Sequence, residues 1–173
     1  GTLRRENKII YGIKGKDMKS LLSLSIILLG FWLPLNVDAQ DFELDEITVS
    51  QLNDAYASGK YTAVDVVRLY LARIEALNKK GPHLNAVIMV NPDALKIAAA
   101  LDEERAKSGP RGPMHGIPVI LKDNINTKDK MPTTAGSLAL MENYAADDAP
   151  MVASLRKAGA IILAKSNLSE WAN

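Results

Sequence analysis

From Ile47 onward the chain alternates helix-forming segments with short apolar runs, and this alternation restricts its fold more than any other feature. The helical segments open on residues such as Thr48 and Thr62, whose side chains cap helix N-termini, and they end at Gly or Pro. The apolar runs are rich in β-branched residues and too short for helices, which is typical of strands. Continuous apolar strands separated by helices predict an α/β fold with a sheet buried on both faces.

The same pattern predicts the individual elements. Strands are expected at 85–90, 117–121 and 160–164, and helices after Thr48, after Thr62, from Asn91–Pro92 to about Gly109, from Ala149 to Lys157 and from Leu168 onward. The helix after Thr62 carries an apolar face at helical spacing, which needs a sheet or another helix to cover it. Its members are Val67, Tyr70, Leu71, Ile74 and Leu77.

Charge and composition exclude several kinds of function. The 173 residues include 21 Lys and Arg and 20 Asp and Glu, but six basic and three acidic residues precede Gln40, so the remainder carries a net charge of −2. A mildly acidic remainder without basic runs predicts no binding to nucleic acid. The sequence has no cysteine, and its two histidines, His83 and His115, lie far apart, so we expect no metal site. Both histidines are expected to be structural or exposed.

The segment from Met18 to Ala39 is typical of a signal peptide. Lys19 precedes an apolar run that extends from Leu21 to Leu35, and the residues around Asp38 resemble an A-x-A cleavage site, which places cleavage after Ala39. A membrane helix is the alternative, but the run is shorter than about 20 residues and contains Pro34. We therefore expect residues 1–17 to be upstream or non-native sequence, residues 18–39 to contact the membrane only transiently, and residues 40–173 to fold.

Lys122 stands directly after the apolar run 117–121. Functional sites of α/β proteins form where strands end. If this strand is buried, the amine at its end is poorly solvated, and burial lowers the pKa of a lysine toward neutrality and makes it a base. The alternative, favoured by composition alone, is that Lys122 extends into solvent or pairs with Asp123.

Several motifs occur in an order and spacing that resemble the amidase signature family. They are GIPVILKDNI from Gly116, TTAGS from Thr133 to Ser137, and DDAPMVASLRKAGAIILAKSNLSEWAN from Asp147 to Asn173. The resemblance covers about 47–173, and the NLSEWAN ending is most similar to secreted bacterial peptide amidases. It implies the N-terminal portion of the amidase signature fold, a mixed sheet flanked by helices and incomplete here.

The resemblance also implies a reaction. Members of this family hydrolyse carboxylic amides, and for this chain we expect amides such as C-terminal peptide amides to give acid and ammonia through a Ser-Ser-Lys triad. Lys122 matches the lysine that acts as the base, which deprotonates a bridging serine that in turn activates the nucleophilic serine. Neither a metal nor an organic cofactor is implied. With the leader, the resemblance predicts a secreted or periplasmic bacterial enzyme.

The two serines belong, in the family, to a Gly/Ser-rich segment that follows the NLSEWA region. This sequence contains no such segment, so we expect activity from a longer polypeptide and none from this chain alone. Ser137, Ser166 and Ser169 are more simply turn or cap residues. The alternatives are a non-catalytic truncated or pseudogene product and a relative of the A subunit of the tRNA-dependent amidotransferase, although a secretory leader argues against the latter.

Four further residues are candidates for substrate binding. Thr134 and Ser137 are expected to shape the loop beside Lys122, with capping of a helix through Ala139 as an equal alternative. Trp171 and Ala172 match part of the family's acyl-binding wall, and a core tryptophan is the alternative. The neighbours of Lys122, Asp123 and Asn124, either orient the lysine loop or form a turn.

Overall fold

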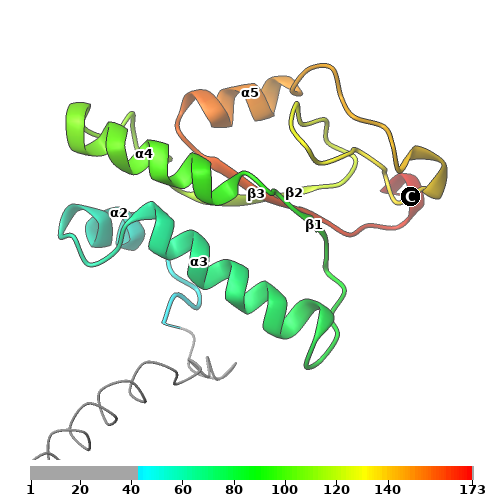
Figure 1. Cartoon of the computed structure of the whole chain (residues 1–173), viewed down its shortest axis with the longest axis horizontal. Coiled ribbons are helices and arrows are strands. Elements are labelled where there is room, and N and C mark those ends of the chain that lie inside the picture. The colour runs from blue at the N-terminus through cyan, green and yellow to red at the C-terminus, as the bar shows by residue number, and fades with distance from the viewer. Residues whose placement is uncertain (1–42, 173) are drawn as a thin grey trace, which may run out of the picture. The chain divides into compact units, whose positions relative to one another are not determined.

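The computed structural model describes residues 43–172, so the predicted leader and the residues before it lie outside this range (Figure 1). A three-stranded sheet forms the centre, with strands β1 (Val87–Val90), β2 (Pro118–Lys122) and β3 (Ile161–Ser166) in the order β1-β3-β2. β3 is antiparallel to β1 and parallel to β2. The predicted α/β class and mixed sheet are confirmed.

The helices lie close to the predicted positions. They are α2 (Val49–Ala57), α3 (Ala63–Ile74) with the π-helical turn η1 (Glu75–Lys79), α4 (Ala94–Ser108) and α5 (Pro150–Lys157). The helix expected from Leu168 is wrong, because only a 3-10 turn, η3 (Glu170–Ala172), forms there. Trp171 has φ 60 and Ala172 has φ 62, which an α-helix does not accommodate. The helix expected through Ala139 is likewise a 3-10 turn, η2 (Leu138–Leu140).

The N-terminus of α3 is held by two sets of acceptors. The first set includes the predicted capping residue, because Thr62 accepts the Asp65 N–H at 3.1 Å and the Asp65 carboxylate accepts the Thr62 N–H at 3.0 Å. The second comes from α4, where the Asp102 carboxylate accepts the N–H groups of Ala63 at 2.8 Å and Val64 at 3.0 Å. These N–H groups have no partner within the helix, so Asp102 both caps α3 and ties it to α4.

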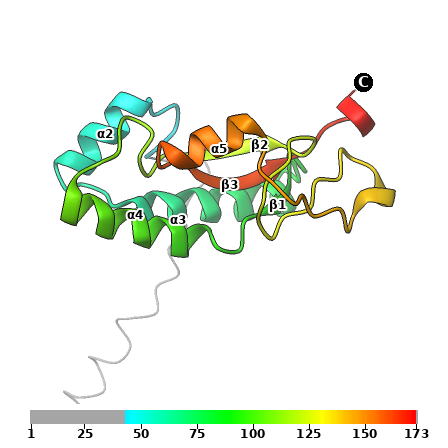
Figure 2. The ribbon, with the colours of Figure 1, turned by 90° about the horizontal axis from the view of Figure 1, so that it is seen from above.

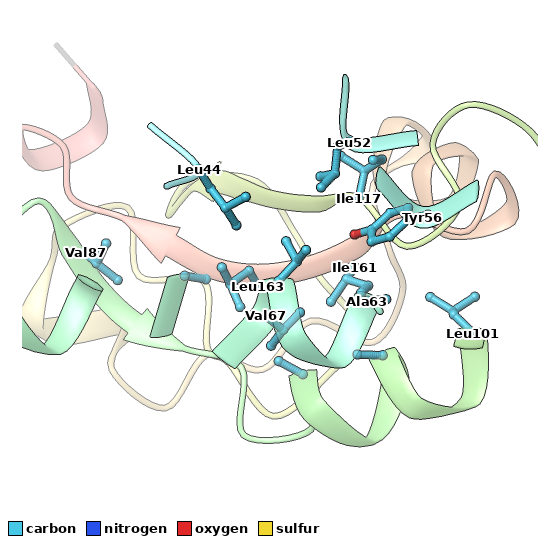
Figure 3. Close-up of a cluster of buried hydrophobic side chains, with 14 residues drawn as sticks. Leu44, Leu52, Tyr56, Ala63, Val67, Val87, Leu101, Ile117, Ile161 and Leu163 are labelled. Carbon is cyan, nitrogen blue, oxygen red and sulfur yellow. The ribbon is translucent and has the colours of Figure 1, made fainter. Parts of the chain in front are cut away.

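The sheet separates two apolar clusters. Helices α3 and α4 lie on one side of the sheet and α5 lies on the other, as two perpendicular views show (Figures 1 and 2). On the first side, Ile161 and Leu163 of β3 pack with Ala63 and Val67 of α3 (Figure 3). The smaller cluster, beneath α5, consists of Leu121, Met131, Val152 and Ile162.

The expectation that every strand is buried on both faces holds for β3 but is wrong for β2. β2 pairs only with β3 among residues 43–172, and its Ile120 is 43% exposed. Five of the six residues of β3 are buried. Because β3 has a neighbour on each side and a cluster on each face, it is the central strand of this sheet.

His115 is buried and contacts two other segments, which confirms its predicted structural role, whereas His83 is exposed. The Nδ1 of His115 accepts the Arg111 N–H at 3.3 Å, so Nε2 carries the hydrogen that faces the Leu101 carbonyl at 2.9 Å. Gly159 lies against the ring with φ +89, and a Cβ at this position would stand 2.9 Å from Nδ1. The turn before β3 therefore requires glycine for both its conformation and its space.

The cap provided by Asp102 gives a test of the α3–α4 junction. Replacing Asp102 with Ala leaves two helix N–H groups without acceptors, so we expect the free energy of unfolding to fall by about 1–2 kcal/mol. Glu103→Ala is the matched control, because Glu103 is 73% exposed and its ion pair with Lys107 spans 3.6 Å. That control should change stability by less than about 0.5 kcal/mol in urea denaturation. Equal effects of the two substitutions would contradict the assigned cap.

Candidate functional site

Lys122 ends β2, where it lies opposite Ser166 of β3. Its Nζ donates a hydrogen bond to the backbone carbonyl of Asn167 at 2.8 Å. The expected burial of Lys122 needs correction, because its end of β2 is uncovered in the part of the chain described. Its exposure agrees with the alternative that it extends into solvent, and its hydrogen bond goes to Asn167 rather than to Asp123.

Asp123 is buried and holds the loop that follows Lys122. Its carboxylate accepts hydrogen bonds from the backbone N–H and the hydroxyl of Thr134, and its backbone carbonyl accepts the Ala135 N–H at 3.1 Å. Its own N–H donates to the Ser166 carbonyl at 3.1 Å. The turn predicted at Asp123 and Asn124 is confirmed. In addition, Asp123 binds three segments together beside Lys122, as the orienting role requires.

The loop Thr133–Ser137 packs against the segment after β3. Trp171 donates its N–H to the Ala135 carbonyl at 2.8 Å. Gly136 has φ +77, and a Cβ there would lie 3.3 Å from both the Leu168 carbonyl oxygen and the Glu170 Cα. The glycine of the TTAGS motif is therefore needed for a left-handed backbone and for close approach of the two segments.

This packing forms a cavity of about 240 Å³ beside β1. Its polar lining comes from Thr134, Ser137 and Asn167, and the apolar lining is provided by Ile88, Met89, Pro132, Leu138 and Met141. The same Asn167 supplies the carbonyl that accepts the Lys122 hydrogen bond. Thr134 and Ser137 therefore lie in one cavity with Asn167, the hydrogen-bond partner of Lys122, whereas Lys122 itself does not line it.

The remaining predicted residues are placed differently. Trp171 is 63% exposed, so it does not belong to the core formed by residues 43–172. Neither Trp171 nor Ala172 lines the cavity within residues 43–172. Ser137 stands at the N-cap position of η2, but its side chain makes no capping hydrogen bond. Ser137 therefore occupies the predicted capping position, but its side chain does not cap the turn.

Sequence reasoning missed Lys165, which is fully buried in β3. Its Nζ donates to the Ile125 carbonyl at 2.7 Å and to the Thr133 hydroxyl at 3.2 Å, which ties both ends of the loop after Lys122 to the sheet. Burial lowers the pKa of Lys165, while the carboxylates of Asp123 and Asp129 oppose this shift. The available signal was the strand itself, because extending the run 160–164 by one residue places Lys165 inside it.

Across residues 43–172, no group of three His, Asp or Glu side chains could hold a metal ion. The helices of this same range include none that is long and apolar enough to cross a bilayer. The polar residues of the site are Lys122, the hydroxyl groups of Thr134 and Ser137, Asn167 and the buried carboxylate of Asp123, which suit proton transfer and hydrogen bonding.

Comparison with known proteins shows which family the chain resembles. The sequence model of the family named Amidase matches residues 65–173. The peptide amidase of Stenotrophomonas maltophilia is 50% identical in sequence, with a TM-score of 0.74 over 77% of this chain and 27% of its own. A probable amidase of Arabidopsis thaliana is 47% identical over 134 residues, or 76% of this chain and 26% of its own length.

A third relative has a different name. The A subunit of the Glutamyl-tRNA(Gln) amidotransferase of Rhodospirillum rubrum is 39% identical over 129 residues, which cover 75% of this chain and 25% of that protein. The chain spans about a quarter of the length of the relatives that it matches.

The lowered pKa of Lys165 predicts a pH-dependent stability. The folded chain releases this proton at lower pH than the unfolded chain, whose lysine titrates near 10.5, so unfolding takes up a proton in the interval between the two values. The contribution of Lys165 to the free energy of unfolding should therefore rise as the pH increases toward 10.5.

Lys165→Met isolates this contribution, because it keeps an unbranched side chain and removes the amine. The difference in unfolding free energy between wild type and Lys165→Met should shift in favour of wild type as the pH rises. Lys96 is exposed, so Lys96→Met should show no such pH dependence. A difference that stays constant with pH would show that Lys165 titrates normally.

Proposed function

Because this chain belongs to the amidase signature family, we propose that it forms part of an enzyme that hydrolyses carboxylic amides to acid and ammonia. C-terminal amides of peptides are the proposed substrate class. The observation that carries the proposal is the likeness in sequence and fold to the peptide amidase of S. maltophilia. The family match includes Lys122, the loop Thr133–Ser137 and Asn167.

Lys122 is the proposed base. An amide needs an activated nucleophile, a proton for the departing nitrogen and donors for the oxyanion. In the proposed reaction, the neutral amine of Lys122 removes a proton from a bridging serine, which takes the proton of the attacking serine. The proton held by Lys122 later passes to the amide nitrogen, which leaves as ammonia. Water then hydrolyses the acyl-enzyme and releases the acid.

The proposed reaction needs groups beyond those described. Lys122 is exposed, and so is part of the neighbouring Ile120, which leaves this end of β2 accessible to other polypeptide. We propose that a further part of the protein covers Lys122, supplies both serines and excludes water. Such cover would reduce the solvation of the amine and favour its neutral form. The 173 residues alone are then inactive.

The cavity beside Asn167 is the proposed binding site for part of the substrate. Its lining is mainly apolar, with the hydroxyl groups of Thr134 and Ser137 and the side chain of Asn167 as polar exceptions. Such a combination suits an apolar side chain attached to a backbone that needs hydrogen-bonding partners. This supports an amidated peptide with an apolar residue close to the amide.

The tRNA-dependent amidotransferase is the second candidate, and the relative in R. rubrum favours it. Identity to that protein is lower than identity to the peptide amidase. The two candidates differ in their products: a peptide amidase releases ammonia from an amidated peptide, whereas the amidotransferase would form Gln-tRNA(Gln) from Glu-tRNA(Gln). We expect the first activity and not the second.

The role of Lys122 can be tested in the full-length protein that contains this chain. Wild type should release ammonia from a C-terminally amidated dipeptide, and Lys122→Ala should lower kcat by at least about a hundredfold, because the base is lost. Lys96→Ala removes an exposed lysine of α4 and should leave kcat unchanged. Ammonia release is measured with a coupled assay, and thermal unfolding checks that each variant is folded. Retained turnover in Lys122→Ala would remove this lysine from the mechanism.

Export of the protein is a separate proposal, which rests on the sequence from Met18 to Ala39. If the segment is a signal peptide, the protein recovered outside the cytoplasm begins at Gln40. Mass spectrometry of the intact protein from each cell fraction tests this. A protein that retains residues 18–39 and stays in the cytoplasm would contradict export and would favour the amidotransferase candidate.

A further inference from the structure

Asn167 is held in place by three hydrogen bonds of its own. Its backbone N–H donates to the Ala86 carbonyl at 2.8 Å, and its side-chain Nδ2 donates to the Asn85 carbonyl at 3.0 Å. Its Oδ1 accepts the N–H of Leu168 at 2.9 Å. The residue is therefore joined both to the segment that enters β1 and to the chain that follows it, so its orientation is restricted although it is exposed.

The backbone carbonyl of this fixed residue accepts the hydrogen bond from Lys122 Nζ at 2.8 Å. Asn167 follows Ser166, which lies opposite Lys122 in the sheet, so the acceptor stands one residue beyond the strand pair. A lysine side chain has four rotatable bonds, and an exposed one samples many rotamers. One fixed acceptor selects those rotamers that point Nζ toward the end of β3.

We infer that Asn167 is a positioning residue for Lys122, an inference that rests on the proposed function. A neutral lysine amine has two N–H groups and one lone pair. When one N–H is donated to the Asn167 carbonyl, the lone pair is confined to directions away from that carbonyl. General-base catalysis requires the lone pair to meet the proton that it removes, so this restriction aligns the base.

The position requires asparagine because its side chain donates and accepts at once. Aspartate keeps the acceptor for the Leu168 N–H, loses the donor to the Asn85 carbonyl and adds a negative charge near Lys122. Serine has one hydroxyl on a shorter side chain, so it cannot reproduce both contacts. The two substitutions therefore separate the effect of added charge from the effect of a lost tether.

The experiment compares Asn167→Asp and Asn167→Ser with Asn53→Asp in the full-length protein. Asn53 is the matched control, because its Nδ2 also donates to backbone carbonyls, those of Val49 and Pro113, both at 2.9 Å, but on α2. For each variant, kcat and KM for ammonia release from an amidated dipeptide are measured across the acidic and basic limbs of the pH profile. Thermal unfolding reports the structural cost of each substitution.

We expect Asn167→Asp to move the acidic limb of the kcat/KM profile to higher pH by about one unit, because a nearby carboxylate favours the charged form of an amine. Asn167→Ser should lower kcat about tenfold, roughly the effect of one hydrogen bond, and should leave the acidic limb of the profile in place. Asn53→Asp should affect only the melting temperature, and its pH profile of kcat/KM should coincide with that of wild type.

Two results would overturn the inference. One is an Asn167→Asp profile that coincides with that of Asn53→Asp. The other, decisive if Asn167→Asp does not fold, is an Asn167→Ser variant whose kcat equals that of wild type or whose loss lies in KM alone. Failure of the proposed function looks different, since wild type would then release no ammonia or Lys122→Ala would keep its activity.

Discussion

The burial of β3 is the constraint on which the rest of the structure depends. This strand pairs with β1 on one side and β2 on the other, and its residues contribute to the apolar clusters on both faces. Its last residue, Ser166, lies opposite both Val87 and Lys122, so three strand termini meet around one position. The candidate base, its acceptor Asn167 and the cavity all lie at this meeting point. The sheet places Lys122 and Asn167, and the loop Thr133–Ser137 completes the cavity beside them.

Two buried charged residues hold the loops at this position. Asp123 and Lys165 lie almost entirely out of water, and their hydrogen bonds go mainly to backbone groups and threonine hydroxyls. Burial of a charge is unfavourable unless hydrogen bonds compensate it, so such residues add little to stability compared with an apolar pair. What they provide is a defined loop conformation. The loop between β2 and η2 contains few apolar anchors, and these contacts join both of its ends to the sheet.

Much of the fold could be predicted from the sequence because it depends on local signals. The caps at Thr48 and Thr62 and the short apolar run of β3 each act within a few residues. The tertiary features were harder to predict. The exposure of Lys122 depends on what covers β2, the positive φ of Trp171 depends on packing against Ala135, and the burial of Lys165 depends on which face of β3 it occupies. The motifs drew attention to Thr134 and Ser137, which line the cavity, whereas only the geometry revealed Asn167.

The strand order also has a consequence for how the molecule forms. β1 and β2 do not pair with each other, and their common partner β3 is the last of the three strands in the chain. During synthesis on the ribosome, β1 and β2 therefore have no β3 to pair with until residues 161–166 have left the exit tunnel. The helices α3 and α4 can associate earlier, because they are close in sequence and joined by Asp102. Pairing of β3 with β1 and β2 is then a late step between segments far apart in sequence. Until it occurs, the unpaired strands can associate with other chains.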